Sequence, residues 1–157
     1  MRTATRSRNV SRPPRRRSGA VAVEGAIVLS VFLVVLMTML DVSLAAARYN
    51  ALSECVRRAG RMAIVRGERS PASKQFGPTT WEGTAKDSHA VTAPLRSLLI
   101  TMPADKVHIR MTWPDGGNKV GQRVRIELTY SQKPTVPVLL GSTPWKLTAA
   151  TTMRIVH

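Results

Sequence analysis

A single carboxylate inside an apolar run constrains this chain more than any other feature. Glu24 is followed by sixteen residues, 25–40, that carry no charge. As a helix, this run spans about 24 Å, slightly less than the ~30 Å hydrocarbon core of a bilayer. A membrane-spanning helix must therefore include Glu24 at one end or continue past Asp41 to Ala47 at the other. Because an ionised group in hydrocarbon is expensive, either arrangement indicates a use for a carboxylate at that depth.

Positive charge is concentrated before the apolar run. The first nineteen residues hold seven arginines and no acid, within a formal net charge of +15 for the chain. Positive residues beside an apolar segment stay on the cytoplasmic side, so we expect a cytoplasmic N-terminus and an extracytoplasmic remainder. The remaining 17 basic and 9 acidic residues form no stripe with interleaved aromatics, which argues against a nucleic-acid partner. The arginines interpreted as the topology signal are Arg12, Arg15, Arg16 and Arg17.

Beyond Leu40 the helical period continues, but the helix becomes amphipathic. Charged residues such as Glu54 and Arg57 occupy other faces than the apolar stripe, and Gly67 followed by Pro71 ends the pattern. We therefore predict one helix over residues 20–66, with a transmembrane segment at about 20–42. The stripe consists of Ala45, Tyr49, Leu52, Val56, Ala59 and Ala63.

The C-terminal part, residues 67–157, changes to a period of two. A loop over 71–83 and a short helix over 94–100 precede two alternating runs, 107–113 and 123–130. A proline-rich passage then separates these runs from a third strand expected at 147–156. Such a sheet needs a helix to cover its apolar face. The fold class is therefore predicted to be α+β, a long N-terminal helix packed on a small antiparallel sheet of about three strands.

Three stretches of the chain resemble the TadE family, which are minor pseudopilins of tight-adherence pilus systems and similar to type IV pilins. They are Arg-Ser-Gly-Ala-Val-Ala-Val-Glu at 17–24, the helix at 41–66 with its Arg-Ala-Gly-Arg at 58–61, and the closing Leu-Thr-Ala-Ala-Thr-Thr-Met-Arg at 147–154. Two positions differ from the usual pattern of the family. Gly25 stands where a phenylalanine commonly follows the glutamate, and Ser30 lies near the position of a frequent proline.

The resemblance implies a processed, membrane-anchored assembly subunit. A prepilin peptidase would remove the leader, residues 1–19, by cutting between Gly19 and Ala20. Glu24 would then be the fifth residue of the mature chain, and it would pair with the new terminal amine of a neighbouring subunit and set the register between them. The implied location is the inner membrane, as a single-pass protein. The implied partners are the lipid bilayer, the prepilin peptidase, other pilins or pseudopilins, and pilus assembly proteins.

Two other interpretations of the N-terminus remain open. In the first, the apolar run is an ordinary signal peptide, and cleavage at the A-x-A pattern of Ala45 and Ala47 releases a secreted domain that begins at Arg48. In the second, the chain is an unprocessed single-pass anchor and Glu24 lies at headgroup level. Either would leave the exterior domain with a binding role unrelated to pili.

Neither catalysis nor a cofactor is expected. The chain has no G-x-S-x-G elbow, no paired carboxylates at helical spacing and no glycine-rich phosphate loop. His89, His108 and His157 are scattered, without a second metal ligand at a suitable spacing. The single cysteine, Cys55, cannot form an internal disulfide and is interpreted as a small apolar residue of the helix.

Overall fold

The computed structural model describes residues 18–156 of the chain. Contacts divide the chain into two units, Met1–Val35 and Leu36–His157, and the first helix contributes to both. Short 3-10 helices at Ala72–Lys74 and Ala104–Lys106 complete the elements. The helices and strands are α1 (Ser18–Ile64), β1 (Trp81–Thr84), α2 (Ala93–Arg96), β2 (Val107–Thr112), β3 (Arg123–Gln132), α3 (Pro137–Leu140) and β4 (Trp145–Arg154).

Within the first unit, the described part of α1 buries none of its large apolar side chains. Their exposed fractions run from 38% at Val34 to 67% at Val21. The hydroxyl of Ser30 donates to the carbonyl oxygen of Ala26 at 2.8 Å, so this polar group is satisfied inside the helix. A helix that is apolar on every side and exposed on every side needs an apolar environment around it.

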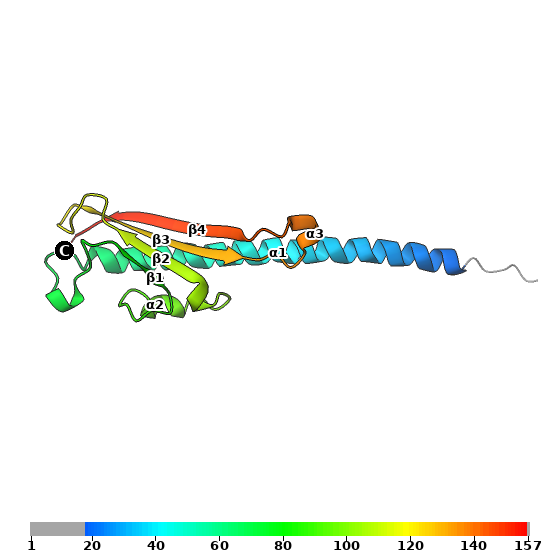
Figure 1. The fold of residues 1–157 in the computed structure, drawn as a ribbon, viewed down its shortest axis with the longest axis horizontal. Coiled ribbons are helices and arrows are strands. Elements are labelled where there is room, and N and C mark those ends of the chain that lie inside the picture. The colour runs from blue at the N-terminus through cyan, green and yellow to red at the C-terminus, as the bar shows by residue number, and fades with distance from the viewer. Residues whose placement is uncertain (1–17, 157) are drawn as a thin grey trace, which may run out of the picture. The chain divides into compact units, whose positions relative to one another are not determined.

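In the second unit the strands form one antiparallel sheet in the order β1-β2-β3-β4 (Figure 1). Each strand pairs with the next strand along the chain, and the register places Ile109 opposite Leu128 and Leu128 opposite Ala149. Alternation along β2 and β3 is strict, with buried residues on one face and polar residues on the other. The period of two in the sequence therefore corresponds to a sheet with one wet face.

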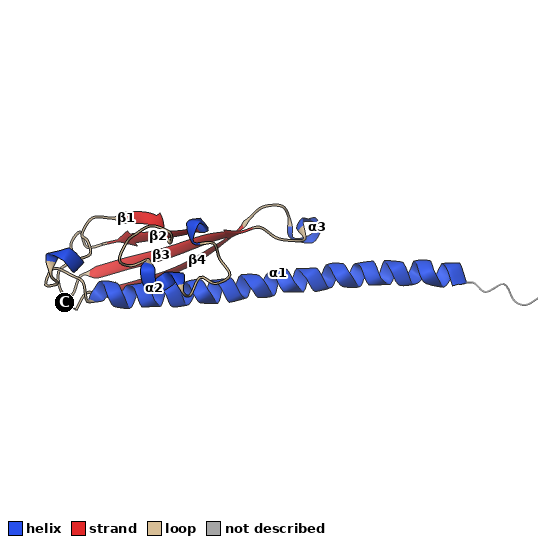
Figure 2. Cartoon of the chain, turned by 90° about the horizontal axis from the view of Figure 1, so that it is seen from below, coloured by secondary structure: helices blue, strands red, loops and turns tan. Residues whose placement is uncertain are grey.

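The core lies between the buried face of this sheet and the helices α1 and α2. The later turns of α1 run along the sheet, as both views show (Figure 2). Cys55 of α1 lies against α2, with its Sγ 4.0 Å from the carbonyl oxygen of Leu95. Fully buried side chains come from each of these elements: Leu52, Cys55 and Ala59 of α1, Leu95 of α2, Ile109 of β2, and Ile126 and Leu128 of β3.

A glycine sets the approach of α1 to β4. A Cβ atom at Gly60 would lie 2.8 Å from Sδ of Met153 and 3.2 Å from Cγ2 of Thr151. The absence of a side chain at this position lets the helix backbone pack directly on β4. Any larger residue would have to displace the end of Met153, which is flexible enough to move.

The expected fold class is confirmed, since a long N-terminal helix packs on a small antiparallel sheet. The sheet has four strands rather than the predicted three. The additional strand is β1, which lies at the end of the region predicted to be a loop. This strand has only four residues, includes Gly83 and pairs on one side only, so it carries no periodic signal. The short helix α2 ends at Arg96 rather than at residue 100.

The stripe predicted for α1 is confirmed at four positions, Leu52, Val56, Ala59 and Ala63, which are buried. At Tyr49 the prediction was wrong, because this side chain is 47% exposed.

Candidate functional site

The predicted cleavage position lies in the first turn of α1. Helix α1 begins at Ser18, so the bond between Gly19 and Ala20 follows directly. Both residues are exposed, and a Cβ atom at Gly19 would meet nothing within 4 Å. Glycine is a poor helix former, so the helix opens here at lower cost than at other residues. The arginines assigned to topology, Arg12, Arg15, Arg16 and Arg17, lie outside the described residues.

Glu24 lies one turn further along the helix and is exposed. Its side chain borders a shallow apolar groove together with Ala20, Val23, Ile27 and Val28. No ion pair within residues 18–156 involves this carboxylate. The helix thus presents a single charge on an apolar surface, and nothing in the described part of the chain neutralises it.

Asp41, at the other end of the charge-free run, has the opposite environment. It is buried, with 4% of its surface exposed. Its Oδ2 accepts hydrogen bonds from the backbone N–H of Thr135 at 2.7 Å and of Val136 at 3.1 Å. The side chain of Gln132 donates to the carbonyl oxygen of Asp41 at 3.3 Å. Two backbone donors satisfy the carboxylate, and α1 is thereby tied to the segment between β3 and β4.

Arg48, two turns after Asp41 on α1, makes a cation–π contact with the sheet. The guanidinium of Arg48 is 5.4 Å from the centre of the Tyr130 ring, on β3. Its Nε and the Oε1 of Gln132 are buried without a hydrogen-bond partner among the described residues. Residues 41–48 of α1 therefore make several polar contacts with the sheet and with the segment after β3, although most of these residues are apolar.

The most hydrophobic part of α1 is long and apolar enough to cross a membrane. Within Gly19–Ile64, an 18-residue window reaches a mean hydropathy of 2.6. This is the single such helix in residues 18–156.

Comparison with protein families identifies the same segment. Residues 19–61 match the family model described as TadE-like protein. The N-terminal helix is TadE-like. The resemblance drawn from the sequence is confirmed over this range, which begins at Gly19 and includes Glu24 and Asp41. The third stretch of the resemblance, residues 147–154, lies outside the match. No curated protein and no solved structure matches the chain.

The match makes residues 19–61 similar to a family associated with tight-adherence pili, and the apolar helix in this range fits a single-pass membrane anchor. The family is generally non-enzymatic. The match ends at Arg61, so the sheet is known from the structure alone.

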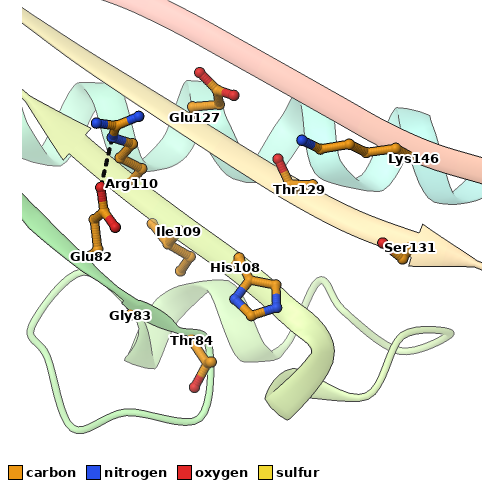
Figure 3. Close-up of a pocket in the computed structure, with 10 residues that line it drawn as sticks. All are labelled: Glu82, Gly83, Thr84, His108, Ile109, Arg110, Glu127, Thr129, Ser131 and Lys146. Carbon is orange, nitrogen blue, oxygen red and sulfur yellow. Dashed lines mark ion pairs between the residues drawn. The ribbon is translucent and has the colours of Figure 1, made fainter.

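Polar side chains line a shallow pocket on the wet face of the sheet (Figure 3). Arg110 of β2 and Glu82 of β1 form an ion pair at 2.8 Å, and both side chains are 62% exposed. An exposed pair of this kind contributes about 0–1 kcal/mol. His108 and Thr129 line the same shallow pocket. No three His, Cys, Asp or Glu residues within the described chain are grouped so that they could hold a metal ion.

Burial shifts the pKa of two groups in the domain, Cys55 and His89. Burial raises the pKa of the Cys55 thiol to about 11, and the charge of Glu54 adds to this shift. A thiol of such high pKa forms little thiolate and reacts slowly, which fits the predicted apolar role. His89 is half-buried and stacks on Trp81, with ring centres 4.2 Å apart. Burial, followed by the positive charge of Arg66, lowers the pKa of His89.

Proposed function

We propose that this chain is a pseudopilin-like subunit for the assembly of a tight-adherence pilus. It is anchored in the inner membrane by residues 20–42 and processed by a prepilin peptidase between Gly19 and Ala20. The observation that carries the proposal is Glu24. It is an exposed carboxylate on an apolar helix, without an ion pair in the described chain, five residues after the glycine at which the family match begins. We infer that its partner comes from a neighbouring subunit.

Cleavage supplies such a partner. Cutting after Gly19 creates an α-amino group on Ala20, one helical turn from Glu24. In a low-dielectric environment neither charge is stable alone, whereas the amine of one subunit and the carboxylate of its neighbour compensate each other. A misplaced subunit would leave both groups unpaired. The pair therefore provides a register as well as an attraction.

The contacts of Asp41 count against cleavage after Ala47. Such a cut would separate Asp41 from the domain whose Thr135 and Val136 it holds, and would divide α1. The arginine-rich leader favours a cytoplasmic N-terminus and an extracytoplasmic sheet domain. The action of the protein is then structural, since its stem anchors the subunit and its exterior domain presents contacts to other pilins and assembly proteins.

The test is the N-terminal residue of the protein purified from the membrane of a host that carries the peptidase. We expect the wild-type chain to begin at Ala20 and a Gly19→Leu chain to keep its leader. Gly25→Leu is the matched control, because a Cβ atom at Gly25 also meets nothing within 4 Å and this glycine lies outside the cleavage site. Normal maturation of the Gly19→Leu chain would refute the processing site. A mature chain that begins at Arg48 would instead establish a signal peptide.

A further inference from the structure

The segment that joins β3 to β4 has an unusual composition for an exterior loop. Residues 134–145 carry no charge, and exposed lysines, Lys133 and Lys146, bound them on each side. Within this segment lies α3, with the sequence Pro-Val-Leu-Leu. Trp145 is half-buried beside Lys146. Apolar residues between lysines, with a tryptophan at the margin, are typical of protein segments at the membrane–water interface.

Asp41 fixes the depth of this segment. The backbone of Thr135 and Val136 is held by a carboxylate that directly follows the charge-free run of residues 25–40. Beyond Asp41 the helix remains uncharged to Ala47. The segment therefore contacts α1 between two uncharged stretches, at the level where the proposed membrane span of residues 20–42 ends.

The hydrogen bonds from Thr135 and Val136 also lower the cost of placing the carboxylate of Asp41 at the edge of the membrane. An unpaired carboxylate next to hydrocarbon is costly, whereas one that accepts two backbone N–H bonds and is shielded from solvent is compensated. In both views α3 lies beyond the ends of β3 and β4, at the opposite end of the sheet from the turn between β2 and β3 (Figures 1 and 2). One end of the domain thus carries the uncharged segment, and the other carries the polar turn.

We propose that residues 134–145 rest on the outer surface of the bilayer that α1 crosses, with lipid headgroups and the upper acyl chains as their partner. The domain then has a second membrane contact in addition to its helix. This contact orients the sheet about the helix and hides the carboxylate of Asp41 from both water and hydrocarbon. The inference rests on the membrane-spanning role proposed for α1, and the test separates the two.

The test uses the full chain in vesicles of phosphatidylcholine and phosphatidylglycerol, with one environment-sensitive fluorophore on a single cysteine. Cys55→Ala removes the native thiol. The label is placed at Pro137→Cys or, in a second variant, at Thr143→Cys, because both native residues are exposed. Lys119→Cys, in the exposed turn between β2 and β3, is the matched control for the domain. A label at Leu29→Cys reports on the membrane segment. Lipids that carry a quencher near the headgroup or deep in the acyl chain measure the depth of each label.

We expect the shallow quencher to remove most of the emission at positions 137 and 143 and to leave position 119 unaffected, while the deep quencher acts at position 29. If positions 137 and 143 behave like position 119 while position 29 is quenched, the loop contact is refuted and the membrane anchor stands. If position 29 is not quenched either, the membrane-spanning role itself fails, and the loop contact fails with it.

Discussion

Glu24 and Asp41 lie on the same helix, seventeen residues apart, at the two ends of one uncharged run. Asp41 is buried and accepts hydrogen bonds from Thr135 and Val136. Glu24 is exposed and forms no ion pair in the part of the chain that the structure describes. One acid is therefore satisfied by folding, and the other keeps, within residues 18–156, a charge that the proposed assembly would use. The membrane end of a helix can keep a reactive charge only if the rest of the chain does not neutralise it.

The largest effect is expected from removing the charge that folding leaves unsatisfied. Glu24→Ala should abolish or nearly abolish pilus assembly, because no carboxylate remains to pair with the amine of the neighbouring subunit. The measurement is the number of pili per cell, with the N-terminal residue of the mature chain as a parallel readout. Processing should continue, since Glu24 lies outside the scissile bond. Val23→Ala is the control for helix packing, and equal loss of pili in both variants would contradict a role for the charge.

The second prediction compares two leucines of α1. Leu52 is fully buried against the sheet, whereas Leu29 is 57% exposed. Leu52→Ala should lower the free energy of unfolding of the domain by about 2–5 kcal/mol, through lost apolar burial and the cavity left behind. Leu29→Ala should leave it unchanged. Denaturant unfolding of the full chain in detergent, followed by tryptophan fluorescence, measures both. Equal effects would mean that the two parts of α1 are not distinct in their packing.

The third prediction concerns the satisfied acid. Asp41→Ala leaves the N–H groups of Thr135 and Val136 without an acceptor, so we expect a loss of about 2 kcal/mol in the free energy of unfolding. Asp41→Asn keeps one acceptor oxygen and should lose less. The same unfolding assay gives both values. Glu24→Ala should not change this free energy, and a loss as large as that of Asp41→Ala would remove the contrast between the acids.

The sequence predicts the regular parts of this molecule and misses the parts that depend on partners. Apolar periodicity of 3.6 and of 2 was enough to place the later turns of α1 and the strands β2 and β3, because each buries one face over many residues. The residues of β4 were assigned to a strand because threonines favour an extended backbone. The strand β1 was missed, since it depends on pairing with β2 rather than on its own pattern. The hydrogen bonds of Asp41 were also missed. Their donors are backbone N–H groups 94 and 95 residues away, and backbone groups leave no mark in a sequence.

At the candidate site, the sequence indicated which residues carry chemistry and left their environments open. Glu24 could be singled out without the structure, because a charged residue in an apolar run is conspicuous. The sequence predicted that a membrane-spanning helix would bring one of two acids to the edge of the bilayer, and the structure shows a separate feature, the burial of Asp41 against the segment between β3 and β4. The environment of His89 was also left open by the sequence, and the structure places Trp81 and Phe76 around this ring.

The smallest effect is expected from His89, in the domain half of the molecule. Its pKa lies below its ordinary value of 6.5, since burial and then Arg66 disfavour the charged form. Its contribution to stability is therefore complete above about pH 6.5 and is lost as the pH falls from there through the folded pKa. Protonation also removes the acceptor that Nδ1 offers to the N–H of Val91. The denaturant midpoint measured from pH 7.5 to pH 5 should fall modestly.

His89→Gln should flatten this dependence, whereas His108→Gln, an exposed change on the wet face of the sheet, should not. An unchanged slope in the His89 variant would show that another group titrates in this range.

The long separation between Asp41 and its donors has a consequence for the order of events during synthesis. Thr135 is made 94 residues after Asp41. At about 5–20 residues per second, the helix waits about 5–20 s for those N–H groups. In the proposed membrane orientation, the carboxylate must be hydrated or protonated throughout that time, so α1 cannot take up its final depth when it first enters the bilayer. The arrival of the segment between β3 and β4 therefore decides when the stem is finally seated.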